Sequence, residues 1–267
     1  MTIPLFQLMD DVRVQLHGYP AVLTGSSVAL RTYGLKPSPI TDLDVFTYTG
    51  EALMAAAAVL LQSPAFTLDE RNRALHWRWM RYGLKGWHTQ SLKLSHVSGH
   101  EVNLVFKTLG NRPTASALQV IETFDYGFLA QGYDLSLETG QLTDLRTAFF
   151  PGQDLNQLPL LPLRGQSWVK GLFMEHQGLK ALSRYTRYAG YGFDMELVRQ
   201  QLMQGYIQAA AFYQTSADVD KQRLGLIYET TATLLRQNDL AQLEAAGKAV
   251  PKKDQLEELL DTLQDLL

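Results

Sequence analysis

The sequence predicts an α+β protein, in which a mixed, largely antiparallel sheet with helices is followed by an all-helical C-terminal domain. Two observations lead to this prediction. Residues 1–147 contain several short runs rich in β-branched and aromatic residues, which alternate between apolar and polar side chains. Beyond residue 165 we find no convincing strand and the apolar spacing is compatible with helices, and the intervening stretch from 150 to 165 carries three prolines and two glycines. We therefore expect a first domain over 1–147, a connection over 148–165 and a helical domain over 166–267.

The N-terminal elements follow from local patterns. Apolar residues at helical spacing predict a helix over 5–17, and Gly18 and Pro20 end it. A short apolar run over 21–23 predicts a strand, which leads through a turn of small residues into a helix from Val28. A strand is expected over 40–48 and an alanine-rich helix over 51–61, whereas 75–82 could be either a strand or an amphipathic turn.

Two hairpins and a series of helices complete the prediction. The segments 91–97 and 101–107 alternate around Ser98-Gly99, and 128–137 and 141–145 flank Thr139-Gly140. A helix over 114–121 separates the two hairpins. The C-terminal helices are expected over 172–188, 195–213, 219–236 and 255–267.

The composition excludes several classes of chemistry. The chain of 267 residues contains no cysteine, which rules out disulfides, thiolate zinc sites and thiol nucleophiles. Any metal must therefore have oxygen or imidazole ligands. We see neither a signal-peptide pattern nor a long apolar run, so we expect a cytoplasmic protein with no membrane partner. The net charge of −3 argues against a surface built for general phosphate binding.

An Asp-x-Asp pair provides the strongest indication of chemistry. Side chains alternate along a strand, so Asp42 and Asp44 project from one face about 6.5 to 7 Å apart, while Leu43 and Val45 enter the core. Two adjacent carboxylates repel each other, and a divalent cation such as Mg²⁺ or Mn²⁺ would neutralise both. The pair is thus predicted to be catalytic and to bind metal.

A small-residue turn upstream complements the carboxylate pair. Gly25 permits close backbone approach, and the amides and hydroxyls of Ser26 and Ser27 at a helix start suit the oxygens of a nucleoside triphosphate. Thr24-Gly25-Ser26 followed by Asp42-Leu43-Asp44-Val45 resembles the pattern of the polymerase β-like nucleotidyltransferase superfamily. The resemblance covers the first domain and implies a nucleotidyltransferase palm. It also implies metal-dependent transfer of a nucleoside monophosphate to a hydroxyl, with pyrophosphate leaving.

The superfamily normally supplies a third carboxylate from a neighbouring strand. The strand expected here carries Asn103, where an Asp might be sought. Asp125, flanked by two aromatic residues, is our first choice for a third catalytic and metal-binding acid, and Glu101, on the polar face with Asn103, is the alternative. If neither serves, the protein binds a nucleotide without transferring it.

A basic helix face is expected in the second domain. Lys180, Arg184 and Arg187 are spaced by four and three residues, with Tyr185 and Tyr188 beside them. Such a face could hold phosphate and stack a base, and the segment 182–188 is similar to the helix after the palm in tRNA nucleotidyltransferase-like proteins. A solvated basic face is the competing interpretation.

Three functions remain open at this point. The chain could transfer a nucleoside monophosphate from a triphosphate to RNA, with a tRNA end as one candidate acceptor. The acceptor could instead be the hydroxyl of a protein or a small molecule. Alternatively, the palm is catalytically silent and acts as a nucleotide-binding or inhibitory module.

Overall fold

The computed structural model describes residues 4–36, 42–69, 80–82, 87–109, 112–121, 124, 126–137, 142–144, 146, 177–248 and 261–266. The chain divides into two compact units, Met1–Asn156 and Gln157–Leu267. The expected connection over 148–165 lies outside the described residues, so its boundaries stay a prediction. The first unit is α+β with a mixed sheet, as predicted, and its elements are α1 (Leu5–Gln15), β1 (Ala21–Thr24), α2 (Ser26–Thr32), β2 (Asp42–Thr47), α3 (Gly50–Leu60), β3 (Phe66–Leu68), β4 (Met80–Tyr82), β5 (Trp87–His96), β6 (Glu101–Leu109), β7 (Arg112–Pro113), α5 (Ala117–Ile121), η1 (Gly127–Leu129), β8 (Gln131–Asp134) and β9 (Leu142–Asp144).

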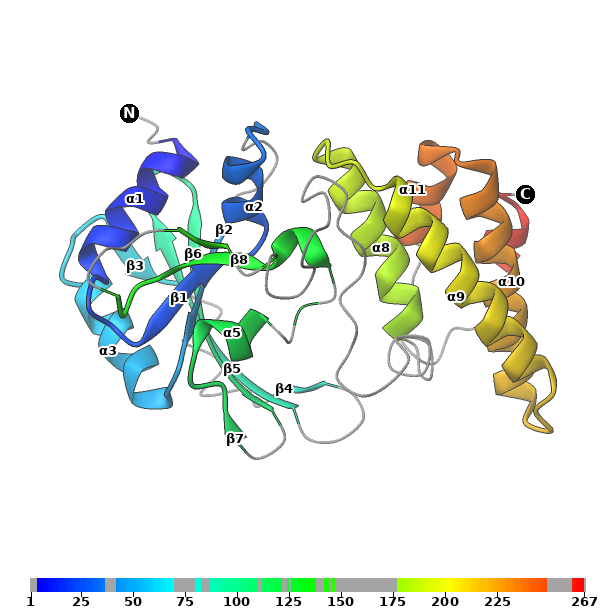
Figure 1. Cartoon of the computed structure of the whole chain (residues 1–267), viewed down its shortest axis with the longest axis horizontal. Helices are drawn as coiled ribbons and strands as arrows, with labels where there is room; N and C mark the ends of the chain where they lie inside the picture. Colours follow the sequence, from blue (N-terminus) through cyan, green and yellow to red (C-terminus); the bar gives the residue numbers. More distant parts are fainter. Residues whose placement is uncertain are drawn as a thin grey trace. The chain divides into compact units, whose positions relative to one another are not determined.

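The strands form one sheet in the order β3-β5-β6-β2-β1-β8-β9, with β4 beside β5 and β7 beside β6 (Figure 1). Of the pairings described, only that between β2 and β6 is parallel. The other pairings are antiparallel, including those of β1 with β2 and β8, of β5 with β6 and of β8 with β9. The predicted hairpin around Ser98-Gly99 is confirmed as β5 and β6, and Gly99 adopts a positive φ of 86° at its turn.

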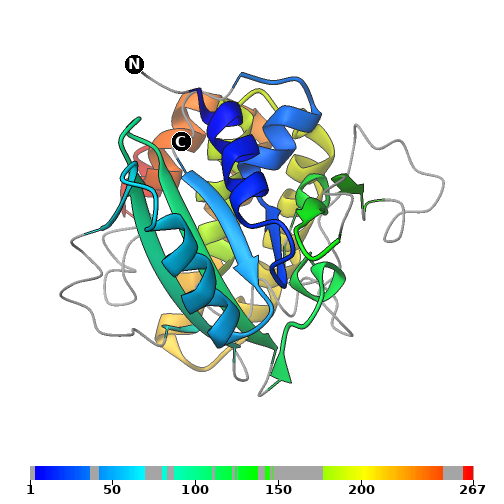
Figure 2. The same cartoon turned by 90° about the vertical axis from the view of Figure 1, so that its left-hand side faces the viewer.

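The two faces of the sheet are covered differently. Helices α1 and α3 lie over the face that buries Leu43 and Val45 of β2 (Figures 1 and 2). The opposite face carries Asp42 and Asp44 at one end, and its other end is covered by α5. There a cluster of buried residues joins the sheet to α5, with Phe124 packed against it: Val22, Phe46, Tyr48, Val105, Ala117 and Val120. Because side chains alternate along β2, Leu43 and Val45 enter the apolar core on one face, while Asp42 and Asp44 form the polar end of the other face.

Some predicted elements have different bounds. The helix expected over 114–121 begins at Ala117, because Thr114 Oγ1 donates to the Lys107 carbonyl oxygen and holds that residue beside β6. The strand expected over 128–137 is shorter, since Gly127–Leu129 forms a 3₁₀ turn before β8. The segment 75–82 is described only at its end, where β4 pairs with β5.

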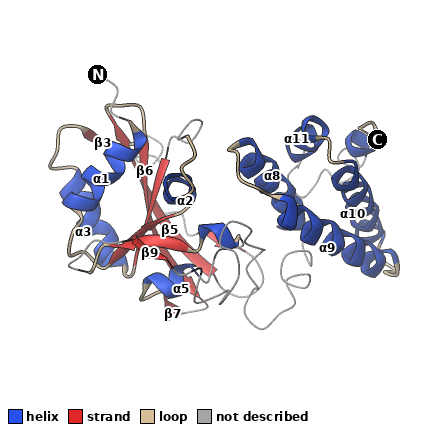
Figure 3. Ribbon diagram, turned by 45° about the horizontal axis from the view of Figure 1, so that its top comes forward, coloured by secondary structure: helices blue, strands red, loops and turns tan. Residues whose placement is uncertain are grey.

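The described part of the second unit consists of helices (Figure 3). They are α8 (Gln177–Gly190), α9 (Glu196–Gln214), α10 (Val219–Gln237) and α11 (Leu240–Lys248). The first three match predicted helices, whereas α11 was not predicted. Residues 157–176 and 249–260 are outside the described part, so an all-helical C-terminal domain stays a prediction over its whole length.

A tyrosine cluster fills the core between α9 and α10. Tyr206 and Tyr228 are fully buried, with ring centroids 5.5 Å apart, and Tyr213 lies 5.9 Å from Tyr228. Gly225 lets the two helices approach closely, since a Cβ at that position would lie 3.2 Å from the Cβ of Tyr213. Asp218 is the N-cap of helix α10, and its carboxylate accepts from the amides of Asp220 and Lys221.

Candidate active site

Four polar residues form a row across four strands of the first unit. Thr24 on β1 pairs with Asp44 on β2, Asp44 pairs with Asn103 on β6, and Asn103 pairs with Lys93 on β5. Residues paired across a sheet point to the same face, so this row lies on the face that also carries Asp42. Asp42 in turn pairs with Glu101 of β6. The structure therefore brings together two of the expected carboxylates, Asp42 and Asp44, with the alternative acid Glu101.

The Asp44 carboxylate is the centre of this row. Asn103 Nδ2 donates a hydrogen bond to Asp44 Oδ1 at 3.0 Å. The pKa of Asp44 is raised to about 6, mainly by burial and also by the neighbouring charge of Asp42, against the opposing effects of Asn103, Lys107 and Lys93. A half-buried carboxylate beside another acid has a strong electrostatic reason to bind a cation.

Gly25 lies directly against Asp44. It adopts a φ of 92°, and a Cβ at that position would lie 3.0 Å from Asp44 Oδ2. Only glycine combines this backbone conformation with such a close approach at no steric cost. The small-residue turn and the carboxylate pair, separate in sequence, are thus adjacent in space as expected.

The start of α2 presents polar groups beside Gly25. Gly25 is the N-cap, and no side chain caps this helix. The first helical hydrogen bond runs from the Ala29 amide to the Gly25 carbonyl, so the three preceding amides have no acceptor within the helix. Ser27 is 1% exposed, and its Oγ has no hydrogen-bond partner in the described part of the chain. Ser26 is half-buried.

The third carboxylate is not settled by the described residues. Asp125 lies outside them. Glu101 lies beside Asp42 in register, but its Oε2 accepts an ion pair from Lys93 Nζ at 3.0 Å. Over the described ranges, no three His, Asp or Glu side chains form a group that could hold a metal ion. Both choices for a third acid stay predictions.

Two lysines of this face were not predicted. Lys93 lies beside Asn103, and Lys107 Nζ lies 5.0 Å from the ring centroid of Phe46, two residues beyond Asp44 on the same face. The signal was present in the sequence, because both lysines share the alternation phase of Asn103 once the hairpin register around Ser98-Gly99 is fixed. Sequence reasoning sought only acids at this place.

The basic face of the second unit is described in part. Arg184 and Arg187 are exposed on α8, and Tyr188 is half-buried with its ring centroid 6.0 Å from that of Tyr191. The expectation that Tyr185 could stack a base is wrong, because this side chain is 3% exposed and packs in the core of this unit. The side chain of Lys180 is outside the described part. A nucleotide-binding role for Lys180, Arg184, Arg187 and Tyr188 stays a prediction.

Comparison with known proteins does not assign this chain to a family. No protein-family model matches the chain, and no curated protein sequence matches it. In the part of the chain that the structure describes, no helix is both long enough and apolar enough to span a membrane.

Proposed function

We propose that this chain is a metal-dependent nucleotidyltransferase, with its active site on the polar end of the sheet around Asp44. The observation that supports this most directly is the 3.0 Å approach between a Cβ at Gly25 and Asp44 Oδ2. It places the uncapped start of α2, which suits phosphate oxygens, against a carboxylate that suits a divalent cation. A triphosphate carried by Mg²⁺ or Mn²⁺ needs both groups side by side.

The residues have distinct roles in this proposal. Asp42 and Asp44 hold the metal, and Gly25, Ser26 and Ser27 receive the phosphates. A divalent cation held by these carboxylates would supply positive charge for the leaving pyrophosphate and would lower the pKa of the attacking hydroxyl. Asp125, or Glu101 if Lys93 releases it, completes the site by positioning or deprotonating that hydroxyl.

The acceptor is proposed to be the hydroxyl of an RNA, with protein and small-molecule hydroxyls as alternatives. The exposed arginines of α8 support RNA, because Arg184 and Arg187 share one helix face and match phosphate in charge and geometry.

A second function is favoured by one observation. Asn103 occupies the register position opposite Asp44, where the superfamily resemblance implies an acid. A palm that lacks its third carboxylate could bind a nucleotide and metal without transferring a nucleoside monophosphate. The protein would then act as a nucleotide-binding or inhibitory module.

Labelled triphosphates separate these functions. We would incubate the protein and Mg²⁺ or Mn²⁺ with each of the four nucleoside triphosphates, labelled on the α-phosphate, and with RNA, protein or small-molecule fractions of a cell extract. Transfer should label one fraction, and a γ-labelled triphosphate should label none. D42N and D44N should reduce labelling by at least about 100-fold while the proteins stay folded, because each removes a metal-binding charge at nearly constant volume.

The outcomes distinguish the alternatives. Full labelling by both variants would exclude Asp42 and Asp44 as metal ligands. Tight triphosphate binding without labelling of any fraction would support the nucleotide-binding module instead of the enzyme. Loss of label in D125N but not in E101Q would identify Asp125 as the third acid, and the reverse result would identify Glu101.

A further inference from the structure

The turn between β5 and β6 is held by the side chain of His96, the last residue of β5. The backbone amide of Ser98 donates to His96 Nδ1 at 3.2 Å, and Ser98 Oγ lies 2.7 Å from the same nitrogen. An amide N–H can donate only to a nitrogen with a free lone pair, so Nδ1 carries no proton and the ring hydrogen is on Nε2. The closed turn therefore requires a neutral imidazole.

His96 lies on the apolar face of the sheet, opposite to the face that carries Asp44. It follows two residues after Leu94, which pairs with the buried Val102 of β6, and it is itself 7% exposed. The ring centroid of Phe66 on β3 lies 4.8 Å from that of His96. A neutral ring suits this environment, because an imidazolium would lose its hydration on burial.

Among the described residues, two titratable groups act on His96 from the elements packed around it. They are Asp11 of α1 and His100, the residue before β6, whereas β3 contributes the apolar ring of Phe66. The pKa of His96 is lowered, mainly by burial and also by the charge of His100, against the opposing effect of Asp11. Because the closed turn disfavours the protonated ring, added protons favour the open turn.

Protonation of His96 removes the acceptor of the Ser98 amide. A proton on Nδ1 can still donate to Ser98 Oγ, but it also points at the amide hydrogen of Ser98, so the backbone hydrogen bond is lost. Around the ring, the His96 amide donates to the His100 carbonyl oxygen at 2.8 Å, and the Val97 amide donates to that of Ala65 at 2.9 Å. Movement of the charged ring towards solvent would loosen these bonds as well.

We propose that His96 is a proton-operated latch, in which the neutral imidazole closes the turn between β5 and β6 and protonation in mildly acidic solution opens it. A proton competes directly with the Ser98 amide for one nitrogen lone pair, so the latch responds to pH without any other ligand. The inference is independent of the proposed function, because His96 lies on the other face of the sheet from Asp44.

Amide exchange followed by NMR tests the latch in the whole chain. At pH 7.5 the ring proton of His96 should be on Nε2, which a long-range proton–nitrogen correlation detects. The protection factor of the Ser98 amide, corrected for the intrinsic effect of pH on exchange, should fall by about tenfold or more between pH 7.5 and pH 5. The Gly18 amide, which donates to the Leu135 carbonyl oxygen at 2.8 Å, is the internal control and should keep its protection.

Two variants assign the effect to one ring. In H96N the side-chain oxygen can accept from the Ser98 amide and does not titrate, so the protection factor should change by less than about twofold between the two pH values. H17N removes an exposed histidine of the same unit and should behave like the wild type. If H96N does not fold, the ring tautomer and the pH series of the wild type carry the test.

Several results would overturn the latch. A proton on Nδ1 of His96 at pH 7.5 would contradict the tautomer that the closed turn requires. Constant protection of the Ser98 amide in the wild type would show that the turn does not open, and an equal loss in folded H96N would assign the opening to another group. A parallel loss of protection at Gly18 would show that acid destabilises the whole unit instead of the turn.

Discussion

At the scale of single residues, the environment of Asp44 has a consequence for stability. Its pKa in the folded protein is about 6, against 3.8 for an ordinary Asp, mainly because the carboxylate is buried. The ionised form is therefore disfavoured by folding. The resulting penalty is absent below about pH 4, grows as the pH rises towards 6 and is present in full above that value.

We expect D44N to be more stable than the wild type at pH 8 by up to about 3 kcal/mol, the free energy that corresponds to this pKa difference. At pH 4 the gain should fall to about 0.5 kcal/mol, because the carboxylate of the folded wild type is then mostly protonated. Urea denaturation of both proteins in a chelator at the two pH values measures the difference. An equal gain at pH 4 and pH 8 would contradict the charge origin of the effect.

Gly25 links backbone conformation to the site. G25A places a Cβ 3.0 Å from Asp44 Oδ2 at a φ of 92°, whereas G18A meets nothing within 4 Å at a φ of 82°. G18A should lose about 1 to 2 kcal/mol from the positive φ alone, whereas the φ of 92° and ψ of −161° at Gly25 are essentially restricted to glycine. G25A should lose more than G18A and should also weaken triphosphate-analogue binding by about tenfold or more, because the carboxylate must move.

Denaturation and calorimetric titration of the two alanine variants provide the measurement. G18A serves as the control for conformational strain alone. Equal analogue affinities in G25A and the wild type would mean that the approach of Gly25 to Asp44 is structural only.

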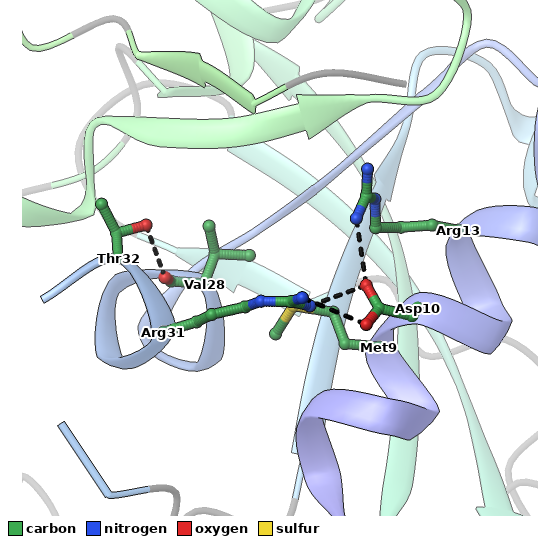
Figure 4. A network of polar contacts seen from close by, with 6 residues as sticks. All are labelled: Met9, Asp10, Arg13, Val28, Arg31 and Thr32. Carbon is green, nitrogen blue, oxygen red and sulfur yellow. Dashed lines mark hydrogen bonds and ion pairs between the residues drawn. The ribbon is translucent and has the colours of Figure 1, made fainter. Parts of the chain in front are cut away.

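At the scale of elements, α2 is tied to α1 by a charged network (Figure 4). Arg31 on α2 donates to both oxygens of Asp10 on α1, at 2.7 and 3.1 Å, and Arg13 donates to the same carboxylate at 3.0 Å. The hydrogen bonds from the two arginines lower the pKa of Asp10 against the opposing effect of burial, which is the largest single influence. The network fixes the helix whose first residues are proposed to meet the phosphates.

A double-mutant cycle with D10N and R31M should give a coupling energy of about 0.5 to 1 kcal/mol at pH 7, a modest value because both side chains are partly exposed. Since the folded pKa of Asp10 is lowered, this contribution is present at neutral pH and is lost as the pH falls through that pKa. Urea denaturation of the four proteins gives the coupling. A cycle with D10N and R13M, which tests the ion pair within α1, serves as the comparison. Zero coupling between Asp10 and Arg31 at pH 7 would show that the ion pair between α1 and α2 contributes nothing to the free energy of unfolding.

Element prediction succeeded where the signal is local. The β5–β6 hairpin was predicted from alternation around Ser98-Gly99, because a period of two and a turn glycine lie within one short segment. Helix α11 was missed although its start was readable. Asp239 Oδ1 accepts from the amides of Ala241 and Gln242 as an N-cap, and Leu243 and Ala246 are buried at helical spacing.

At the scale of the whole molecule, the chain has two separate cores. The first joins the sheet to α1, α3 and α5, and the second is built around the tyrosines of α9 and α10. G225V should damage only the second core, since even a Cβ at Gly225 would lie 3.2 Å from the backbone nitrogen of Gln214 and 3.3 Å from the carbonyl oxygen of Ala210. We expect a loss of about 2 kcal/mol or more from this overpacking.

Differential scanning calorimetry should resolve two transitions and show that G225V lowers only one of them. Triphosphate-analogue binding should remain at the wild-type level if the Asp44 site is confined to the first unit. A common shift of both transitions would instead show that the two units unfold cooperatively.

The sequence by itself determined the carboxylate pair and the small-residue turn that precedes it. Alternation places Asp42 and Asp44 on one face of any strand that contains them, and a glycine before a helix start permits close approach, so both statements depend only on neighbouring residues. The resemblance led us to expect Asn103 on a strand neighbouring the pair, but only the tertiary structure set the register that puts it directly opposite Asp44. Asn103 arrives there because β6 pairs in parallel with β2, and Lys93 follows because β5 is bonded to β6. Strand order between segments far apart in the chain is set by the packing of the whole sheet and its covering helices, and no local pattern encodes it.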